Sequence, residues 1–475
     1  MRKTEENNKD FSTIVFALLE HVNNLPHHNT IDSVIKREAC EDLINLCKSH
    51  QNALQYCNLE ENKHIVTSCQ ANIELRKKVS LYLENKPLAL QKFGPIRFWD
   101  TRNVTDMSGL FEKAHQFNEE LTWDTGNVTS MRRMFNGATR FNNGGQPLNF
   151  DTKNVTNMED MFRQATVFNQ LINYTIFKTN KVTTMQGMFE GAELFDQYIP
   201  FDTKNVTSME TMFEGARRFK NGGQPLNFDT SKVTSMMSMF EGATVFNNPL
   251  NFTDTKSVRF TAYMFHQAEA FDQSINNLNT KHVINMSFMF HSATAFNNGN
   301  EPLTINTEDV FTMTSMFQYA TSFNNGANHN EDHPLRLNTK KVQYMDDMFD
   351  HATSFQQYVD FDTQSAVSMA NMFSHAYAFN NGVFNNYDIE KKPLVFKTGK
   401  VIDMSKMFSH AYIFNQPIKF DNTKKVRDMF EMFCEARRFK NGKEALVFDI
   451  QSVRYMDKMF HNAKVFDKRL FQSIL

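Results

Sequence analysis

The sequence predicts an α/β protein, namely a right-handed solenoid of about fourteen repeats of 24–27 residues preceded by an N-terminal helical cap domain. Two observations predict this class. A unit of the form VTxMxxMFxxAxxF recurs from near residue 100 to the C-terminus, and the 47 Phe and 28 Met of the chain reflect its fixed Phe and Met positions. Residues 1–94 contain no copy of the unit and carry apolar side chains at helical spacing.

The N-terminal segment, residues 1–94, is expected to form three or four helices. Apolar residues recur every three or four positions in Phe11–Val22, Ile31–Cys47 and Ile65–Leu83. Pro26 separates the first two of these segments. We therefore assign residues 1–94 to a helical cap domain and residues 95–475 to the repeat domain.

The repeat is well represented by Val155–Phe168, whose sequence is VTNMEDMFRQATVF. Its apolar positions fall within one arc of roughly 140° at 100° per residue, which predicts one face of a helix. Asp151 and Thr152 precede it and are suited to cap a helix N-terminus. An alternative is that Val155–Met158 is extended and that the helix begins only near Glu159.

A short strand is expected before each such unit, because Leu148-Asn-Phe150 and Leu226-Asn-Phe228 alternate apolar and polar residues. One repeat buries about six apolar side chains, each worth about 1.5–3 kcal/mol. Ordering about 25 residues costs on the order of 1.5 kcal/mol per residue, so an isolated repeat is unstable. The repeats must therefore stack on one another, as in a solenoid.

The Phe of the central Met-Phe pair marks the register of the repeats. Two steps along this register are longer than the rest, 32 residues from Phe317 to Phe349 and 35 from Phe373 to Phe408. The additional residues lie in two polar insertions, 324–334 and 380–393, which we expect to be solvated loops on one side of the array. The register positions are Phe111, Phe135, Phe162, Phe189, Phe213, Phe240, Phe265, Phe290, Phe317, Phe349, Phe373, Phe408, Phe433 and Phe460.

The two insertions are the predicted interaction surface. The candidate residues in them are Asn324, Asn325, His329, Asp332, Asn380, Asn381, Tyr387 and Lys391.

Histidine recurs two residues after the register Phe in three consecutive repeats, at His351, His375 and His410. Stacking of the repeats would place these three side chains in a ladder. Such a ladder could respond to pH or share a divalent ion, because charged imidazoles repel one another and neutral ones bind metals. The alternative is a tolerated polar position that was copied together with its block.

Charge and composition exclude several other function classes. With 51 Lys and Arg against 53 Asp and Glu, the chain has no bulk basic character for nucleic acid or an anionic membrane. Paired arginines such as Arg132-Arg133 lie beside acidic residues, so we expect them on a solvated face. No phosphate-binding glycine loop precedes a helix, and no local motif predicts a catalytic set. We predict no cofactor, no metal centre and no enzymatic activity.

The cysteines are expected to be buried free thiols of a reducing compartment. Cys40, Cys47, Cys57 and Cys69 match no zinc spacing, and Cys434 stands alone in the repeats. A metal site that combines them with His50 or His64 is the alternative.

We also predict no signal peptide and no transmembrane segment, because acidic residues precede a short apolar run, Phe11–Leu19. A cytoplasmic or virion location follows from these expectations.

Two stretches, WDTRNVTDMSGLFEKAHQFN and FDTKNVTNMEDMFRQATVFN, resemble the BspA-type bacterial surface-protein repeat. The variant concerned is that of mycoplasma surface lipoproteins and of some large DNA viruses of protists and algae. The resemblance covers roughly residues 95–470 and implies a leucine-rich-repeat-like solenoid with interaction surfaces and no catalytic residues. Bacterial members carry a secretion signal or a lipid-attached cysteine, which this sequence lacks, so it looks more like the giant-virus and protist members.

The expected function is therefore a non-catalytic scaffold for protein–protein interaction, such as a virion component or host-interaction protein of a large DNA virus. A protein partner is expected, without nucleic-acid binding or membrane insertion. The first alternative is a cell-surface adhesin like the bacterial relatives, and the second is an enzyme whose site has no recognisable motif. The sequence leaves the identity of the partner and the oligomeric state open.

Overall fold

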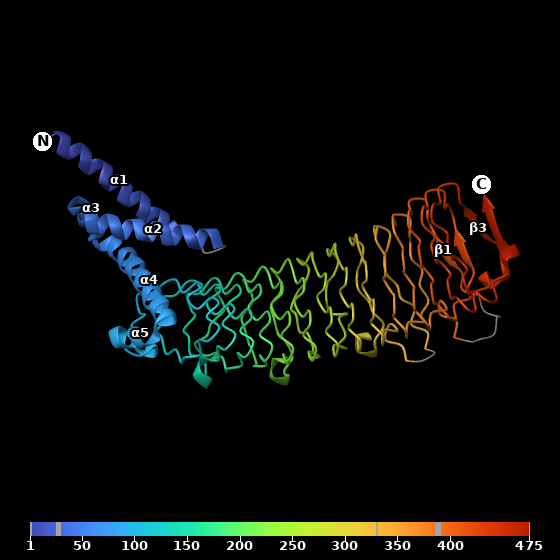
Figure 1. The fold of residues 1–475 in the computed structure, drawn as a ribbon, viewed down its shortest axis with the longest axis horizontal. Coiled ribbons are helices and arrows are strands. Elements are labelled where there is room, and N and C mark those ends of the chain that lie inside the picture. Colours follow the sequence, from blue (N-terminus) through green and yellow to red (C-terminus); the bar gives the residue numbers. More distant parts are fainter. Residues whose placement is uncertain (1, 25–29, 329–330, 385–390, 475) are drawn as a thin grey trace. The chain divides into compact units, whose positions relative to one another are not determined.

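The computed structural model of the chain describes residues 2–24, 30–328, 331–384 and 391–474. The chain forms two compact units, Met1–Val206 and Thr207–Leu475. The first unit contains helices and the first four repeats, and the second contains the other ten (Figure 1).

All α-helices of the described residues lie in the first unit, before residue 94, and none of them is long and apolar enough to span a bilayer. They are α1 (Arg2–Asn24), α2 (Thr30–Ser49), α3 (Gln51–Cys57), α4 (Glu60–Glu84) and α5 (Lys86–Phe93). The apolar periodicity identified the helical segments correctly, and α3 and α5 are additional short helices. Short 3-10 turns follow at Ile96–Phe98 and Asn143–Gly145 in the same unit.

Two disulfides cross-link the helices of the first unit. Cys40 of α2 is bonded to Cys69 of α4, and Cys47 of α2 to Cys57 at the end of α3. The expectation of free thiols is therefore wrong for these four residues. Their sequence spacing gave no indication of pairing, because the helices bring Cys40 and Cys69 together across 29 residues, with 5.2 Å between their Cα atoms. Cys434 is free and buried.

Helix α4 supplies hydrogen-bond partners to the first repeat. The side chain of Asn72 accepts a hydrogen bond from the backbone N–H of Thr105 at 2.9 Å. In the next repeat the equivalent N–H, that of Thr129, donates to the carbonyl of Thr105 instead. Arg76 of α4 also pairs with Asp106, with 2.8 Å between Nη2 and Oδ2. Side chains of α4 thus replace the repeat that would otherwise precede the first one. The compact unit accordingly extends past the expected boundary at residues 94 and 95.

The repeat segment Val155–Phe168 is a series of tight turns, and its prediction as a helix is wrong. Asp160 and Gln164 have φ angles of 55° and 54°, which interrupt any right-handed helix. Successive N–H groups also alternate in their partners. Met161 donates to the carbonyl of Met158 in its own turn, whereas Phe162 donates to the carbonyl of Met188 in the next repeat. The backbone is therefore satisfied half within the repeat and half between repeats.

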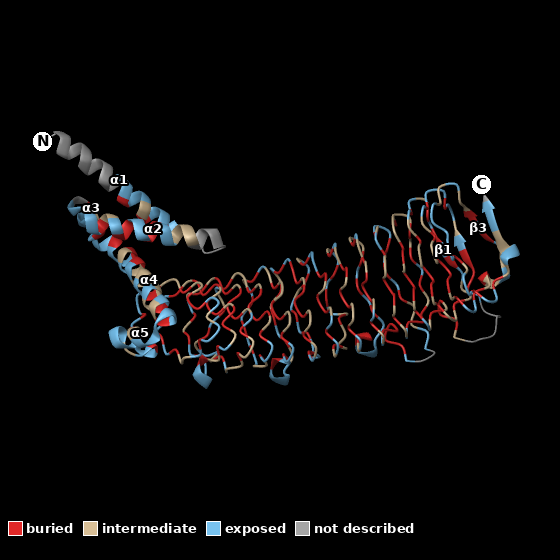
Figure 2. Ribbon diagram, viewed as in Figure 1, coloured by how far each residue is buried: buried red, intermediate tan, exposed pale blue. Residues whose placement is uncertain are grey.

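The predicted core of this segment is nevertheless correct. The apolar side chains of the unit are all fully buried, because a turn of this kind and a helix place the same positions on one face. They are Val155, Met158, Met161, Phe162, Ala165 and Phe168. Figure 2 shows this buried side running through the successive repeats of each unit.

Two columns of Phe rings form the centre of the array. Within one repeat the ring centroids of Phe135 and Phe141 are 3.8 Å apart, and Phe135 lies 5.6 Å from Phe162 of the next repeat. The predicted cap residue Thr152 is buried and donates its hydroxyl proton to the carbonyl of Lys178 at 2.7 Å. It caps no helix, and instead joins two repeats.

Extended segments occur where the sequence predicts strands, but most pair through a single residue. Leu148 forms a parallel bridge with Ile172, and Leu226 with Leu250. A second column of parallel bridges passes through Asn157, inside the alternative extended segment Val155–Met158. Within the described part of the chain, longer strands appear only near the C-terminus, where β1 pairs in parallel with β2 and β3 with β4. Their bounds are β1 (Leu394–Phe396), β2 (Ile418–Phe420), β3 (Leu446–Asp449) and β4 (Phe471–Ile474).

Candidate functional site

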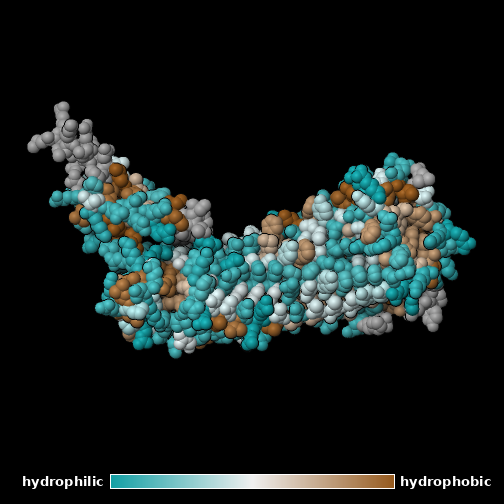
Figure 3. Space-filling view, viewed as in Figure 1, coloured by the Kyte–Doolittle hydropathy of each residue, from teal (hydrophilic) through white to brown (hydrophobic). Residues whose placement is uncertain are grey.

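An exposed row of large apolar side chains crosses the second unit, and we call it the apolar strip. Its members, each 38–44% exposed, are Phe260, Ile284, Phe311, Tyr344 and Ile402. Figure 3 shows apolar patches on the otherwise polar surface of this unit. Exposed large apolar side chains grouped on one surface are typical of interaction sites.

The strip is positioned by the backbone ladder between repeats. The N–H of Phe311 donates to the carbonyl of Ile284 at 2.9 Å, and the N–H of Gln343 donates to the carbonyl of Phe311 at 2.8 Å. A parallel bridge joins Thr312 to Tyr344. The rings of Phe311 and Tyr344 lie 5.6 Å apart, edge to face. Main-chain hydrogen bonds and the parallel bridge therefore hold Phe311 at one repeat's distance from Ile284 and from Tyr344.

Sequence reasoning missed the strip, although the signal is visible. The residue after the repeat's Val is Thr in the first six copies, from Thr105 to Thr234. From the seventh copy onward this Thr is replaced, for example by Ile284, Phe311 and Ile402. Phe260 and Tyr344 lie one residue further along, so large apolar residues at two adjacent surface positions of the repeat are the signal in the sequence.

Four candidate residues of the two insertions are asparagines at buried or half-buried positions, so the expectation that they lie in solvated loops is wrong for the three that are buried. Asn324, Asn325 and Asn381 are buried, and Asn380 is half-buried. Asp332 and Lys391 are exposed. His329 and Tyr387 lie outside the described residues.

The buried asparagines close the base of each insertion. Asn325 donates from Nδ2 to the carbonyl of His333 at 2.7 Å, and Asn381 donates in the same way to the carbonyl of Lys392 at 2.7 Å. Both have positive φ angles, 55° and 51°, which Asn adopts more readily than most residues. The recurring Asn-Gly pair of the spacers marks this role in the sequence.

The two insertions lie on the same side of the unit, as expected. Nζ of Lys392 lies 3.8 Å from Oδ2 of Asp332, so the second insertion contacts the first. A cleft of about 740 Å³ adjoins the first insertion. Its lining includes Leu303, Ile305, Glu308, Asp332, His333 and Arg336.

The predicted histidine ladder is a second candidate site. The ring centroids of His351 and His375 are 4.1 Å apart, and those of His375 and His410 are 4.4 Å apart, with nearly parallel planes. The ring of Tyr319 stacks on His351 at 4.5 Å. Burial, and next the positive charge of His375, lowers the pKa of His410.

The three histidines have positive φ angles of 52–58°, at the position where earlier repeats have Gly191, Gly215 and Gly242.

A buried carboxylate faces two of these rings. Oδ1 of Asp350 lies 2.9 Å from Nδ1 of His351 and 3.4 Å from Nδ1 of His375. Burial alone would raise the pKa of Asp350, but hydrogen bonds from His375, Gln318 and His351 outweigh burial and lower it. Asp350, His351 and His375 are the residues among those described whose side chains could together hold a metal ion.

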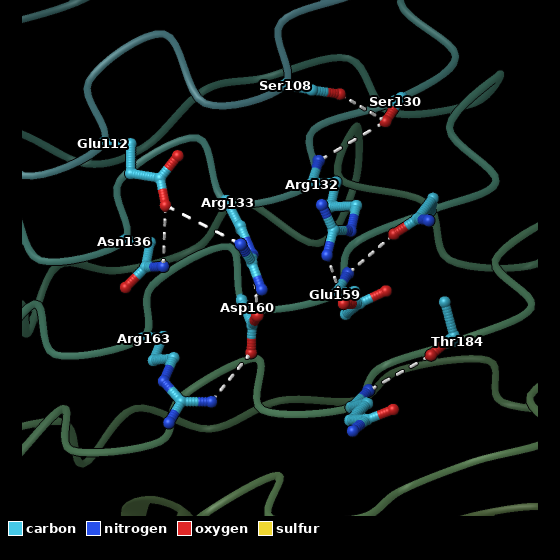
Figure 4. A network of polar contacts seen from close by, with 12 residues as sticks. Ser108, Glu112, Ser130, Arg132, Arg133, Asn136, Glu159, Asp160, Arg163 and Thr184 are labelled. Atoms are coloured by element: carbon cyan, nitrogen blue, oxygen red, sulfur yellow. Dashed lines mark hydrogen bonds and ion pairs between the residues drawn. The ribbon is translucent and has the colours of Figure 1, made fainter. Parts of the chain in front are cut away.

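In the first unit, ion pairs join side chains of neighbouring repeats (Figure 4). Arg132 is only 5% exposed, and its Nη2 lies 2.7 Å from Oε1 of Glu159 in the next repeat. The expectation that this arginine lies on a solvated face is therefore wrong. Arg133 pairs with Asp160 at 3.1 Å, and Arg163 pairs with Glu190 at 2.6 Å. These contacts join neighbouring repeats and so have a structural role.

The stacked turns, their ladder of parallel bridges and the repeated Phe columns define a tandem-repeat protein. Eight overlapping segments, together spanning residues 84–473, match the family described as Mycoplasma protein of unknown function, DUF285. The chain belongs to this family. Neither a curated protein nor a solved structure matches the chain.

Proposed function

We propose that this chain is a non-catalytic scaffold that binds a protein partner through the apolar strip. The proposal includes a leucine-rich-repeat-like right-handed solenoid as the fold class of the repeats. The observation that carries the functional proposal is the exposed strip itself, in which rigid main-chain pairing presents Phe311, Tyr344 and their neighbours to solvent. Aromatic side chains are enriched at the centres of protein interfaces.

The two insertions are a second part of the proposed contact surface. Asp332 and Lys391 are exposed, so they can contact a protein partner, whereas the asparagines at the bases of the insertions are buried or half-buried.

The test compares the wild-type chain with a strip variant that combines Phe311→Ser and Ile402→Ser. Both chains are used for affinity capture from the native source, and the captured proteins are identified by mass spectrometry. A matched control, Val245→Ser with Val447→Ser, removes apolar residues of similar exposure elsewhere on the second unit. We expect the control to retain the partner and the strip variant to lose it. Equal capture by all three chains would contradict the proposal.

A second candidate function is that of a surface adhesin, and the two disulfides support it. Cys40–Cys69 and Cys47–Cys57 would persist in an oxidising environment, such as the outside of a cell or of a virion. A cytoplasmic location is correspondingly disfavoured, and a host-interaction role for a virus protein remains compatible with the disulfides. Protease treatment of intact source cells or virions distinguishes these locations, because only a surface-exposed chain would be cleaved.

A further inference from the structure

We propose that Asp350, His351 and His375 form a binding site for a divalent transition-metal ion such as Zn²⁺. This inference is independent of partner binding by the apolar strip. Each of the three residues offers one ligand atom, and these atoms all lie within 4.8 Å of one another. Two imidazole nitrogens and a carboxylate oxygen are a ligand set that zinc accepts, with the remaining coordination position open to water.

The distances suit a metal ion located between the three ligand atoms. Bonds of about 2.0–2.2 Å in a tetrahedral arrangement place two ligand atoms about 3.4 Å apart. Nδ1 of His375 already lies 3.4 Å from Oδ1 of Asp350, and Nδ1 of His351 is closer, at 2.9 Å. The two rings are nearly parallel, at 15° to one another, so each must turn toward the carboxylate to direct its lone pair at a common ion.

The backbone holds the two histidines in fixed positions, and their rings are partly open to solvent. His351 donates its N–H to the carbonyl of Ser374 at 2.9 Å, and His375 donates to the carbonyl of Ser409 at 2.8 Å. The imidazole side chains are 29% and 28% exposed, so water and an ion can reach them. A site built on such fixed main-chain positions loses little entropy when it binds.

Asp350 is held in the orientation that a ligand requires. Its side chain is 10% exposed, and Nε2 of Gln318 donates to Oδ2 at 2.9 Å. That contact fixes one carboxylate oxygen and leaves Oδ1 directed at the two histidines. Hydrogen bonds of this kind outside the coordination sphere orient ligands in metalloproteins.

The charges around the site favour a cation. Burial, and then the neighbouring Asp350 and Asp346, raises the pKa of Asp347 to about 6, whereas a hydrogen bond with Asn371 and then the charge of Lys406 act in the opposite direction. The carboxylates therefore repel one another, and a bound divalent ion would relieve that repulsion. His410 stacks on His375 but does not belong to the group of ligand atoms that lie within 4.8 Å of one another, so it lies outside the proposed ligand set. Nδ1 of His375 also lies 2.8 Å from the hydroxyl oxygen of Ser374, a contact that metal binding would replace.

The test measures zinc binding by the full-length chain without an affinity tag, by titration calorimetry with ZnCl₂ and by elemental analysis after dialysis. The variants are His351→Asn, His375→Asn and their combination, because Asn tolerates the positive φ angles of both positions. The control is His282→Asn. His282 also faces one carboxylate, with Nδ1 3.2 Å from Oδ2 of Asp309, but it belongs to no such cluster among the described residues.

We expect the wild type and His282→Asn to bind one zinc ion per chain. Each single variant at the site should bind at least about tenfold more weakly, since even partners outside a coordination sphere cost that much when removed. The combined variant should lose stoichiometric zinc. Unchanged binding in the combined variant, or absence of zinc binding by the wild type, would overturn the proposal.

A second measurement on the wild type covers the case in which a variant fails to fold. Loading the chain with Cu²⁺ and recording its electron paramagnetic resonance spectrum counts the coordinating nitrogens. Hyperfine splitting from two imidazole nitrogens supports the site. A spectrum without nitrogen splitting overturns it.

Discussion

Oδ1 of Asn325 accepts a hydrogen bond of 3.0 Å from the backbone N–H of Leu303, which lies in the preceding repeat. Both residues are buried, so this side chain satisfies a main-chain donor that water cannot reach. The same contact recurs through both units. The pairs are Asn143 with Leu121, Asn298 with Ile275, Asn325 with Leu303, Asn381 with Val359 and Asn441 with Ile418.

Replacing Asn325 by Ala should destabilise the chain by about 2–3 kcal/mol, because a buried N–H loses its acceptor and a non-Gly residue without a polar side chain must adopt φ of 55°. Urea unfolding measures the change. The control is Asp332→Ala in the exposed part of the same insertion, expected within about 0.5 kcal/mol of wild type. Equal stability of the two variants would show that the asparagine contact is dispensable.

The Phe column and the apolar strip should respond differently to the same substitution. Phe317 is fully buried and stacks on Phe349 at 5.6 Å, so Phe317→Ala should cost about 3–5 kcal/mol. Phe311 is 44% exposed, and Phe311→Ala should change stability much less. Chemical denaturation of both variants checks this, and a loss for Phe311→Ala as large as that for Phe317→Ala would mean that the strip is part of the core.

His291 should make stability fall as the pH is lowered from about 6.5 to about 4. Burial, and next the charge of His266, lowers its pKa from 6.5 to about 4, while Asp350 acts weakly in the opposite direction. As the pH falls, His291 is protonated in the unfolded chain before it is protonated in the folded chain. Its contribution to the free energy of unfolding is therefore fully present above pH 6.5 and is lost as the pH falls toward 4. After allowance for solvent around a half-buried ring, it amounts to about 1–2 kcal/mol.

The measurement for His291 compares unfolding of the wild type and His291→Gln at pH 7 and pH 4.5, with a chelator present. We expect the variant to lose less stability between the two values than the wild type. His282→Gln serves as the control, because it removes a more exposed imidazole of the same unit. Identical losses in wild type and His291→Gln would refute the assignment.

Alkylation should count the disulfides directly. In protein purified from an oxidising compartment and denatured without reductant, only Cys434 should react, and all five cysteines should react after reduction. Mass spectrometry of the alkylated chain provides the count. Reduction should also destabilise helices α2 to α4, by about 2–4 kcal/mol per disulfide. If all five thiols react without reductant, the cysteines are free, as their spacing in the sequence predicts.

Removal of one partner of the buried ion pair between Arg132 and Glu159 should strongly destabilise the folded chain. Glu159→Ala leaves the guanidinium of Arg132, which is 5% exposed, without its 2.7 Å partner and should cost about 3–5 kcal/mol. The double variant Arg132→Met, Glu159→Leu should recover most of that loss. Asp467→Ala breaks the exposed pair with Arg469 and should cost less than about 1 kcal/mol. The thermal unfolding midpoints of the three variants rank these costs.

Several structural features could be predicted from the sequence because they depend on spacing alone. The positions of Phe162, Met158 and Val155 identified the buried side of each repeat, and the register of His351, His375 and His410 placed three rings in one column. Periodicity reports which side chains share a face. A helix and a series of turns bury the same positions here, so periodicity could not distinguish them.

The partners of the polar groups depended on contacts between residues far apart in the chain. Asn325 resembled a solvated loop residue, yet it is buried because Leu303 of the preceding repeat requires an acceptor. Cys40 and Cys69 appeared unrelated until two helices placed them together.

The sequence by itself thus determined the repeat length, the register and the core of this protein, since apolar burial is decided by pattern. Only the tertiary structure decided the turn conformation, the disulfides and the carboxylate that faces two histidines. Hydrogen bonds and charges act over a few ångströms between specific atoms, and stacking of the repeats is what brings those atoms within range.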